Sequence, residues 1–212
     1  KKKRQTRASK AIDKGLKPLS DLILKQNIFE GNIEKYAKEY LDEEKDLKNI
    51  EDVLQGASDI IAEVVSDDPN YRKYIRSFVR RYGVLKTEEK NKEKDEKDVY
   101  KIYYDYKQKL KEIPEHRILA IDRAENEKII RVKILIDEES ILDYLYNKVI
   151  TDKKSIFSEL IKEAIDDSFS RLIFPSVERT MRSWLTEKAQ KNAIEVFSNN
   201  TKSLLMIPPV EG

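Results

Sequence analysis

"NIEDVLQGASDIIAEVVSDD" (residues 49–68) is the stretch that decides the fold, because its apolar residues recur at helical spacing. Asn49 is a favoured N-cap residue, and the pattern that follows it predicts a helix over residues 50–66. An apolar stripe of this width is typical of a helix that buries one face against its neighbours. The residues of the stripe are Val53, Leu54, Ala57, Ile60, Ile61, Val64 and Val65.

The next stretch, "PNYRKYIRSFVRRYG", predicts a second helix over residues 69–82 that pairs tightly with the first. Pro69 suits the first helical position, and Gly83 is a natural stop. One face of this helix is apolar or aromatic, and the other carries Arg72, Lys73, Arg76, Arg80 and Arg81. Two interpretations stay open for the basic face. It contacts nucleic-acid phosphates, with an affinity that falls with salt, or it is the solvated back of a core helix.

The N-terminal stretch "KKKRQTR" supplies a second set of candidate nucleic-acid-binding side chains, namely Lys2, Lys3, Arg4 and Arg7. It starts without a cap or turn and passes directly into a Leu/Ile pattern. The sequence therefore looks like a piece of a longer protein.

The composition favours long helices covered by charges. Charged residues make up 39% of the 212 residues, with five glycines and six prolines. We predict a mainly α fold, an elongated multi-helix scaffold with at most a small two-stranded β element formed by residues 84–87 and 130–136. A helix is expected around residues 98–108, and two long helices punctuated at Pro175 are expected in the last third.

Several function classes find no support in the sequence. The formal net charge is +2, so a nucleic-acid site has to be local. The chain has no cysteine, no phosphate-binding glycine motif, and no apolar run of the roughly 20 residues that span a bilayer. His116 is the single histidine, and carboxylate spacings typical of metal sites are missing. We therefore predict no enzyme, no metal and no cofactor.

The stretch "IPEHRILAIDRAENEKII" (residues 113–130) is a further candidate site, because it groups the single histidine with several charged residues. On a helix, His116, Ala120, Arg123 and Glu127 form one stripe, with Arg123 and Glu127 at ion-pair spacing. The sequence leaves three roles open for this stripe. They are an internal network that ties the helix to its neighbours, a contact with nucleic acid or a partner, and, as the weakest, catalysis.

Five stretches in this order resemble the Tex family of bacterial transcription accessory proteins. They are "KGLKPLSDLIL", "GASDIIAEVVSDDPNYR", "PEHRILAIDRAENE", "FPSVERTMRSWLTEKAQKNAIEVFSNN" and "LLMIPPVEG", and together they span essentially the whole chain. The third matches the family pattern at Pro114, His116, Arg117, Leu119, Ala120, Arg123, Asn126 and Glu127. Where the family usually has glycine after this arginine, the chain has Ala124, which weakens the case for a close backbone approach there.

The resemblance implies a helical central region with three parts. Residues 1–48 would be the tail of an N-terminal helix-turn-helix part, and residues 49–150 a central region with the helix pair and the β element. Residues 151–212 would be long helices that lead to an RNase H-like domain of the YqgF type. The main RNA-binding module of the family, an OB-fold domain, would lie outside this chain.

The function expected from these observations is that of a fragment of a nucleic-acid-binding transcription accessory protein. It would be a cytoplasmic helical scaffold that positions RNA- or DNA-binding domains, with no membrane and no small-molecule substrate. The alternative is a protein-interaction module that docks to the transcription or ribosomal machinery. In that alternative, Val177, Met181, Trp184 and Leu185 form an exposed ridge instead of core.

Overall fold

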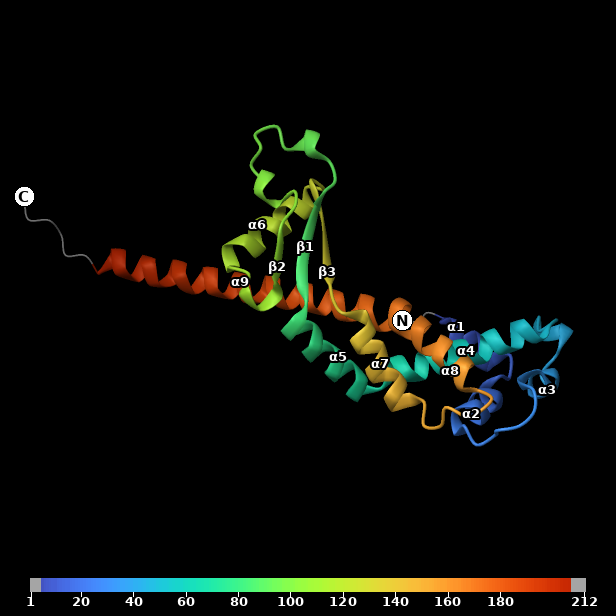
Figure 1. Cartoon of the computed structure of the whole chain (residues 1–212). Coiled ribbons are helices and arrows are strands. Elements are labelled where there is room, and N and C mark those ends of the chain that lie inside the picture. The colour runs from blue at the N-terminus through green and yellow to red at the C-terminus, as the bar shows by residue number, and fades with distance from the viewer. Residues whose placement is uncertain (1–4, 207–212) are drawn as a thin grey trace, which may run out of the picture. The chain divides into compact units, whose positions relative to one another are not determined.

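The computed structural model describes residues 5–206 and confirms a mainly α-helical protein with one small sheet (Figure 1). The chain forms two compact units that interleave along the sequence. The first unit contains the chain up to Ile75 together with Glu138–Val177, and the second contains Arg76–Asp137 together with the chain from Glu178 onward. The boundaries expected after residues 48 and 150 both fall inside the first unit.

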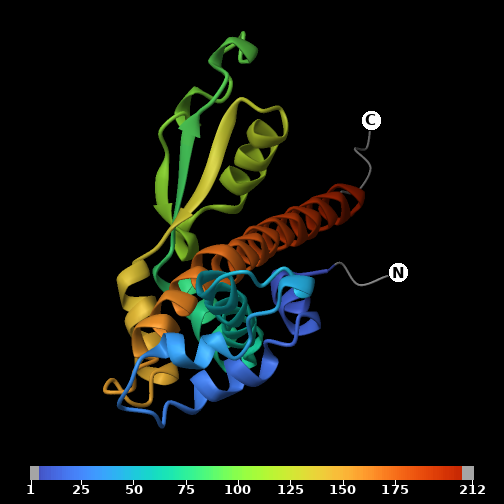
Figure 2. The ribbon, with the colours of Figure 1, turned by 90° about the vertical axis from the view of Figure 1, so that its right-hand side faces the viewer.

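The first unit is built around α4 (Ile50–Asp67). The Asn49 side chain accepts a hydrogen bond of 2.8 Å from the backbone N–H of Asp52, which confirms it as the N-cap. Figure 2 shows α4 beside the N-terminal helices. The helices that pack against it are α1 (Arg7–Asp13), α2 (Lys17–Lys25), α3 (Ile33–Lys38) and α8 (Ser158–Asp167).

The apolar stripe of α4 is core except at Leu54, which is half-buried, and at Val64. Val53, Ala57 and Ile61 are fully buried, whereas the side chain of Val64 is 48% exposed. The buried face packs on α1, α2 and α8, and the tight pairing with the next helix, α5 (Pro69–Tyr82), stays a prediction. The start of α5 agrees with the prediction, because the Asp68 carboxylate accepts a hydrogen bond of 2.7 Å from the backbone N–H of Asn70.

The last third of the chain stays helical through Pro175. A π-helical turn, Ser168–Ile173, joins α8 to the 32-residue α9 (Phe174–Leu205). Pro175 is the second residue of α9, immediately after the turn in which the hydrogen-bond spacing widens, so its missing N–H does not end the helix. The break predicted at Pro175 is therefore a π-helical turn just before this residue, and the chain does not leave the helix there. None of the described helices is long and apolar enough to cross a membrane.

The other described helix of the first unit, α7 (Glu138–Val149), packs on α8 and contacts the start of α5. The rings of Tyr74 and Tyr144 stack with their centroids 3.6 Å apart, and Tyr71 meets Tyr144 edge to face. These aromatic contacts fix the apolar side of the first part of α5.

The second unit contains an antiparallel sheet in the order β2-β1-β3. The central strand β1 (Val84–Glu89) pairs with β3 (Ile130–Leu135), as predicted for these two stretches, and the register places Leu85 opposite Ile134. Helix α6 (Glu115–Asn126) packs on β3, and Figure 2 shows it beside the sheet. Leu85, Ile134, Ile118 and Ile121 are buried there.

The third strand, β2 (Lys107–Lys109), was predicted as part of a helix over residues 98–108. The buried Asp95 carboxylate accepts hydrogen bonds from the backbone N–H groups of Val99, at 2.8 Å, and Tyr100, at 2.7 Å. These bonds satisfy donors that a helix would have used, and the chain forms only a short 3₁₀ turn, Lys101–Tyr103. Val99 and Ile102 are 62% and 66% exposed.

Candidate nucleic-acid interface

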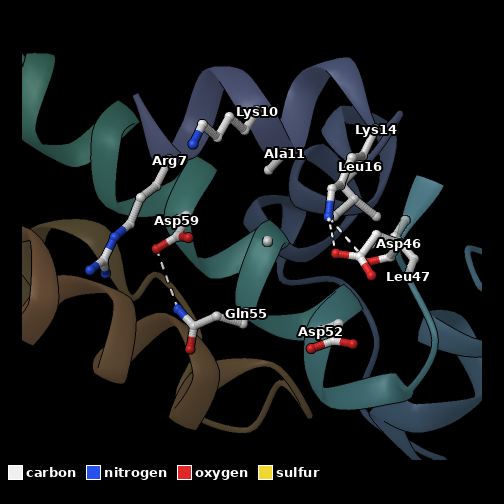
Figure 3. Close-up of a pocket in the computed structure, with 11 residues that line it drawn as sticks. Arg7, Lys10, Ala11, Lys14, Leu16, Asp46, Leu47, Asp52, Gln55 and Asp59 are labelled. Carbon is white, nitrogen blue, oxygen red and sulfur yellow. Dashed lines mark hydrogen bonds and ion pairs between the residues drawn. The ribbon is translucent and has the colours of Figure 1, made fainter. Parts of the chain in front are cut away.

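The N-terminal basic candidates fall into two groups. Lys2, Lys3 and Arg4 lie outside the described residues, whereas Arg7 is exposed at the start of α1. Arg7 lines a cavity of about 250 Å³ between α1 and α4, together with Lys10 and Lys14 (Figure 3).

The opposite side of this cavity carries carboxylates. Asp46, Asp52 and Asp59 all line it, and Figure 3 shows the Lys14 side chain directed at Asp46, with 3.1 Å between Nζ and the backbone oxygen. Because these carboxylates line the same cavity as the three cations, they repel a bound phosphate about as strongly as the cations attract it. The cavity between the two helices is therefore lined by charges of both signs. It does not form a phosphate-binding site around Arg7.

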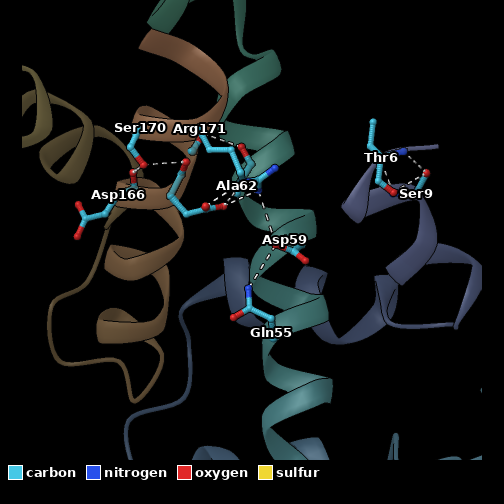
Figure 4. A network of polar contacts seen from close by, with 10 residues as sticks. Thr6, Ser9, Gln55, Asp59, Ala62, Asp166, Ser170 and Arg171 are labelled. Atoms are coloured by element: carbon cyan, nitrogen blue, oxygen red, sulfur yellow. Dashed lines mark hydrogen bonds and ion pairs between the residues drawn. The ribbon is translucent and has the colours of Figure 1, made fainter. Parts of the chain in front are cut away.

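Arg171 connects α4 to the π turn within the first unit (Figure 4). Its Nε donates to Asp167 at 2.9 Å, and its guanidinium lies 3.6 Å from the carboxylate of Asp59. Burial raises the pKa of Asp59, whereas the hydrogen bonds from Arg171 lower the pKa of Asp167. Figure 4 also shows the Gln55 side chain, which donates to Asp59 at 3.3 Å. This network is a structural brace.

Arg72 is not available for phosphate. Its Nε donates to the backbone oxygen of Ser66, its Nη1 lies 3.3 Å from the Ser176 hydroxyl, and its Nη2 lies 4.0 Å from Asp67. The side chain therefore satisfies a carbonyl in the last turn of α4, where a positive charge also complements the helix dipole. The sequence pattern placed Arg72 on the basic face, but these contacts give it a structural role.

The remaining basic residues of α5, namely Lys73, Arg76, Arg80 and Arg81, are exposed. Among the described residues of α5, only Arg72 takes part in an ion pair. The Arg80 guanidinium lies over the Trp184 ring, 4.5 Å from its centroid, and that of Arg81 lies 5.3 Å from the centroid of the Tyr82 ring. In the second unit, α5 thus presents three arginines without a carboxylate partner, two of them beside aromatic rings.

The α6 motif distributes its residues over separate contacts. His116 is exposed, and the side chains of Arg123 and Glu127 both interact with Tyr100, whose hydroxyl donates to Glu127 at 3.0 Å. Asn126 is exposed, Pro114 is the N-cap residue of α6, and the Arg117 guanidinium lies 5.4 Å from the centroid of the Tyr106 ring. In the described part of the chain, no group of three or more metal-ligating side chains is arranged around an ion site.

A different face of α6 carries a polar network that the sequence pattern missed. Arg182 of α9 donates to Asp122 at 2.9 Å and to Glu125 at 2.6 Å, and the Thr186 hydroxyl donates to Asp122 at 2.6 Å. Near the start of α6, Glu115 accepts a hydrogen bond from Asn192 at 2.8 Å. The signal lay in the spacing, because Asp122 with Glu125 and Arg182 with Thr186 are each three or four residues apart and so share a helix face.

Ala124 and Ile129, two further residues of the motif stretch, lie at the end of α6. Ala124 is fully buried, and its carbonyl accepts a hydrogen bond of 3.0 Å from the Ile129 N–H at the end of the helix. The Ala124 methyl group is therefore accommodated within the core.

The proposed ridge on α9 is mostly core. Val177, Met181 and Leu185 are buried, and Trp184 is half-buried beneath Arg80. These three apolar side chains cannot form a docking surface. The exposed apolar residues of α9 lie further along the helix and are Ile194, Val196, Phe197, Leu204 and Leu205.

Comparison with known proteins gives these features a family. A family model described as Tex central region-like matches residues 30–197. The uncharacterized protein YdcI of Bacillus subtilis (strain 168) is 39% identical over 213 residues, which cover all of this chain and 30% of that protein. Transcriptional accessory protein Tex of Neisseria gonorrhoeae is 27% identical over 99% of this chain and 28% of its own length.

A human relative is likewise matched over only part of its own length. S1 RNA-binding domain-containing protein 1 of Homo sapiens is 29% identical over 79% of this chain and 18% of its own length. The chain thus spans less than a third of each of these curated relatives. Because the family model covers most of the sequence, the chain belongs to the Tex central region-like family.

Proposed function

We propose that this chain is the helical scaffold region of a nucleic-acid-binding transcription accessory protein. In this function it holds the RNA- or DNA-binding parts of the longer protein in fixed relation. The printed names of two relatives, a transcriptional accessory protein and an S1 RNA-binding domain-containing protein, support the class of function. The small share of those relatives that the chain spans supports a role alongside other parts.

The observation that carries the scaffold role is the bracing of α9. Its buried Met181 and Leu185 pack within the second unit, and Arg182 bridges two carboxylates of α6 with only 19% of its side chain exposed. Charge-assisted hydrogen bonds of this kind fix the angle and register of two helices. A 32-residue helix held in this way can transmit a fixed geometry over roughly 48 Å of its own length at 1.5 Å per residue.

The proposal assigns no catalysis to this chain and places the protein in the cytoplasm. His116 is exposed and has no hydrogen-bond partner among the described side chains, so it lacks the oriented acid or nucleophile that general-base chemistry requires.

The test uses the longer protein and two matched variants of α9. Arg182→Met removes the bridge to α6, whereas Arg179→Met changes an exposed arginine of the same helix that has no ion pair among the described residues. Arg182→Met should weaken the binding of the longer protein to RNA or DNA, and Arg179→Met should not. Equal binding by the longer protein with and without this region would refute the scaffold role.

A second candidate function is docking to the transcription or ribosomal machinery, and the end of α9 favours it. Ile194, Phe197 and Leu204 are 70%, 73% and 68% exposed, and their spacing places them along one side of the helix. Co-sedimentation with ribosomes and with purified RNA polymerase would test it. Phe197→Ser should abolish co-sedimentation, and Asn199→Ser should leave it intact; co-sedimentation that survives Phe197→Ser would argue against docking through this face.

A further inference from the structure

Five side chains of the second unit combine positive charge with aromatic rings. Arg76, Arg80 and Arg81 are exposed on α5, Tyr82 is 53% exposed, and Trp184 of α9 is half-buried under Arg80. The guanidinium of Arg80 lies 4.5 Å from the centroid of the Trp184 ring. Cation–π contacts use the face of a guanidinium, so the N–H groups along its edge stay available as donors.

Among the described residues, Arg76, Arg80 and Arg81 have no carboxylate partner, like most arginines of this chain; the exceptions are Arg72, Arg171 and Arg182. Arg182 binds Asp122 and Glu125, and Arg171 binds Asp167 and lies near Asp59. The chain has 40 acidic side chains, yet in its described part none forms an ion pair with Arg76, Arg80 or Arg81. Arg80 and Arg81 also lie beside aromatic rings. Exposed arginines next to rings suit an external anion with a flat, stackable group.

We propose that Arg76, Arg80, Arg81, Tyr82 and Trp184 form a binding site for single-stranded nucleic acid. The arginines contact phosphates, and a base stacks on the Arg80–Trp184 pair or on the exposed ring of Tyr82. A duplex offers phosphates but keeps the faces of its bases stacked on one another, so it can use only the arginines. The site deepens the proposed function, on which it rests, by giving this chain a direct contact of its own with the nucleic acid.

The single tryptophan makes the stacking step directly measurable. Trp184 is the only tryptophan in the chain, so fluorescence excited selectively from tryptophan reports on this site alone. The probes are oligo(dT) and oligo(rU) of about 12 nucleotides, within the range that one single-strand site covers, and a DNA duplex of the same length. Titration with either single strand should quench Trp184 fluorescence to saturation, with an affinity that falls as salt rises. The duplex should leave the fluorescence almost unchanged.

Fluorescence anisotropy of labelled oligonucleotides separates the contributions of the residues. Trp184→Leu should weaken single-strand binding by about tenfold, the order expected for one lost stacking partner. Arg80→Gln should weaken it by about fivefold and reduce the salt dependence. Trp184→Phe keeps a ring and should bind close to the original affinity, which guards against a simple loss of fold. Arg131→Gln is the matched control, because Arg131 is an exposed arginine of β3 without an ion pair among the described residues, and it should change nothing.

Three outcomes would overturn this site. They are single-strand binding that ignores Arg80→Gln and Trp184→Leu, binding without quenching of Trp184, and equal use of the same residues by the duplex. The absence of binding to all three probes at low salt, as expected if the cluster contacts a protein, would overturn it as well. None of these results bears on the scaffold role, which the Arg182→Met and Arg179→Met variants of the longer protein test separately.

Discussion

Gly56 of α4 lies directly against Leu16, so that a Cβ added at Gly56 would stand 2.4 Å from Cδ1 of Leu16 and 3.4 Å from Cβ of Ala11. Gly56 is in the interior of a helix, where alanine would normally be favoured by about 1 kcal/mol. Leu16 is fully buried, so its side chain would have to shift to make room for the added methyl group. The close approach of α4 to the N-terminal helices therefore explains the glycine.

Gly56→Ala should destabilise the protein despite its higher helix propensity. Overpacking of a filled core costs about 1–3 kcal/mol, which exceeds the propensity gain. Urea denaturation of the two proteins gives the difference in unfolding free energy. In a Leu16→Ala background the cavity should accept the methyl group, and the same substitution should then be neutral or stabilising. A destabilisation that persists in that background would show that the contact with Leu16 is not the cause.

Arg72→Gln should lower stability without weakening nucleic-acid binding. The substitution removes a charged donor from the Ser66 carbonyl and from the half-buried contact with Ser176, and a hydrogen bond to a charged group is worth about 1.5–3 kcal/mol. The measurements are thermal denaturation and anisotropy with the single-stranded probe. Arg76→Gln is the matched control, and it should give the reverse pattern. If the Arg72→Gln variant loses binding at a temperature where the variant is fully folded, Arg72 contacts the nucleic acid after all.

The sequence was sufficient for the elements whose periodicity is strong. The Asn49 cap, the stripe through Ile61, and the pairing of residues 84–87 with the strand that begins at Ile130 were all predicted, because each depends on a local pattern that tertiary contacts reinforce. The helix expected over residues 98–108 failed because a single buried carboxylate, Asp95, takes two backbone donors. Periodicity counts apolar residues, so it does not register such a competitor.

The candidate site was predictable in part for the same reason. The basic face of α5 follows from helical geometry, but the pattern cannot show that Arg72 is bound by a carbonyl from the preceding helix. It also cannot show that Trp184, 104 residues after Arg80, lies beneath its guanidinium. The brace between Arg182 and the acidic face of α6 likewise joins positions far apart in sequence, and with one chain no local signal links them. Long-range pairing is the information that a single sequence lacks.

Glu178→Ala should destabilise the edge of the sheet. One carboxylate oxygen of Glu178 accepts a hydrogen bond of 2.9 Å from the backbone N–H of Ile134, on β3. Truncation leaves this N–H without its acceptor, at a cost of about 1–2 kcal/mol in unfolding free energy. Glu178→Gln keeps an acceptor and should lose less than half as much. Hydrogen exchange of the Ile134 amide measures the effect at the site, and unchanged protection in Glu178→Ala would contradict this role.

The two carboxylates around Arg171 should respond to pH in opposite directions. Arg171 lowers the pKa of Asp167, so the contribution of Asp167 to stability is present above the unfolded pKa of about 3.9 and is lost as the pH falls through the folded value. Burial raises the pKa of Asp59. Its contribution is therefore fully present below the unfolded pKa and is lost as the pH rises through the folded value.

Matched aspartate-to-asparagine substitutions test this difference. Asp167→Asn should lower the melting temperature near neutral pH, and this deficit should shrink as the pH falls below about 4, where the original carboxylate is itself becoming protonated. Asp59→Asn removes a buried carboxylate whose ionisation opposes folding, so relative to the original protein it should gain stability as the pH rises from about 4 to neutrality. The measurement is the melting temperature of the three proteins across this range. Parallel curves for the two variants would mean that Asp59 and Asp167 share one electrostatic environment, contrary to their different burial and contacts.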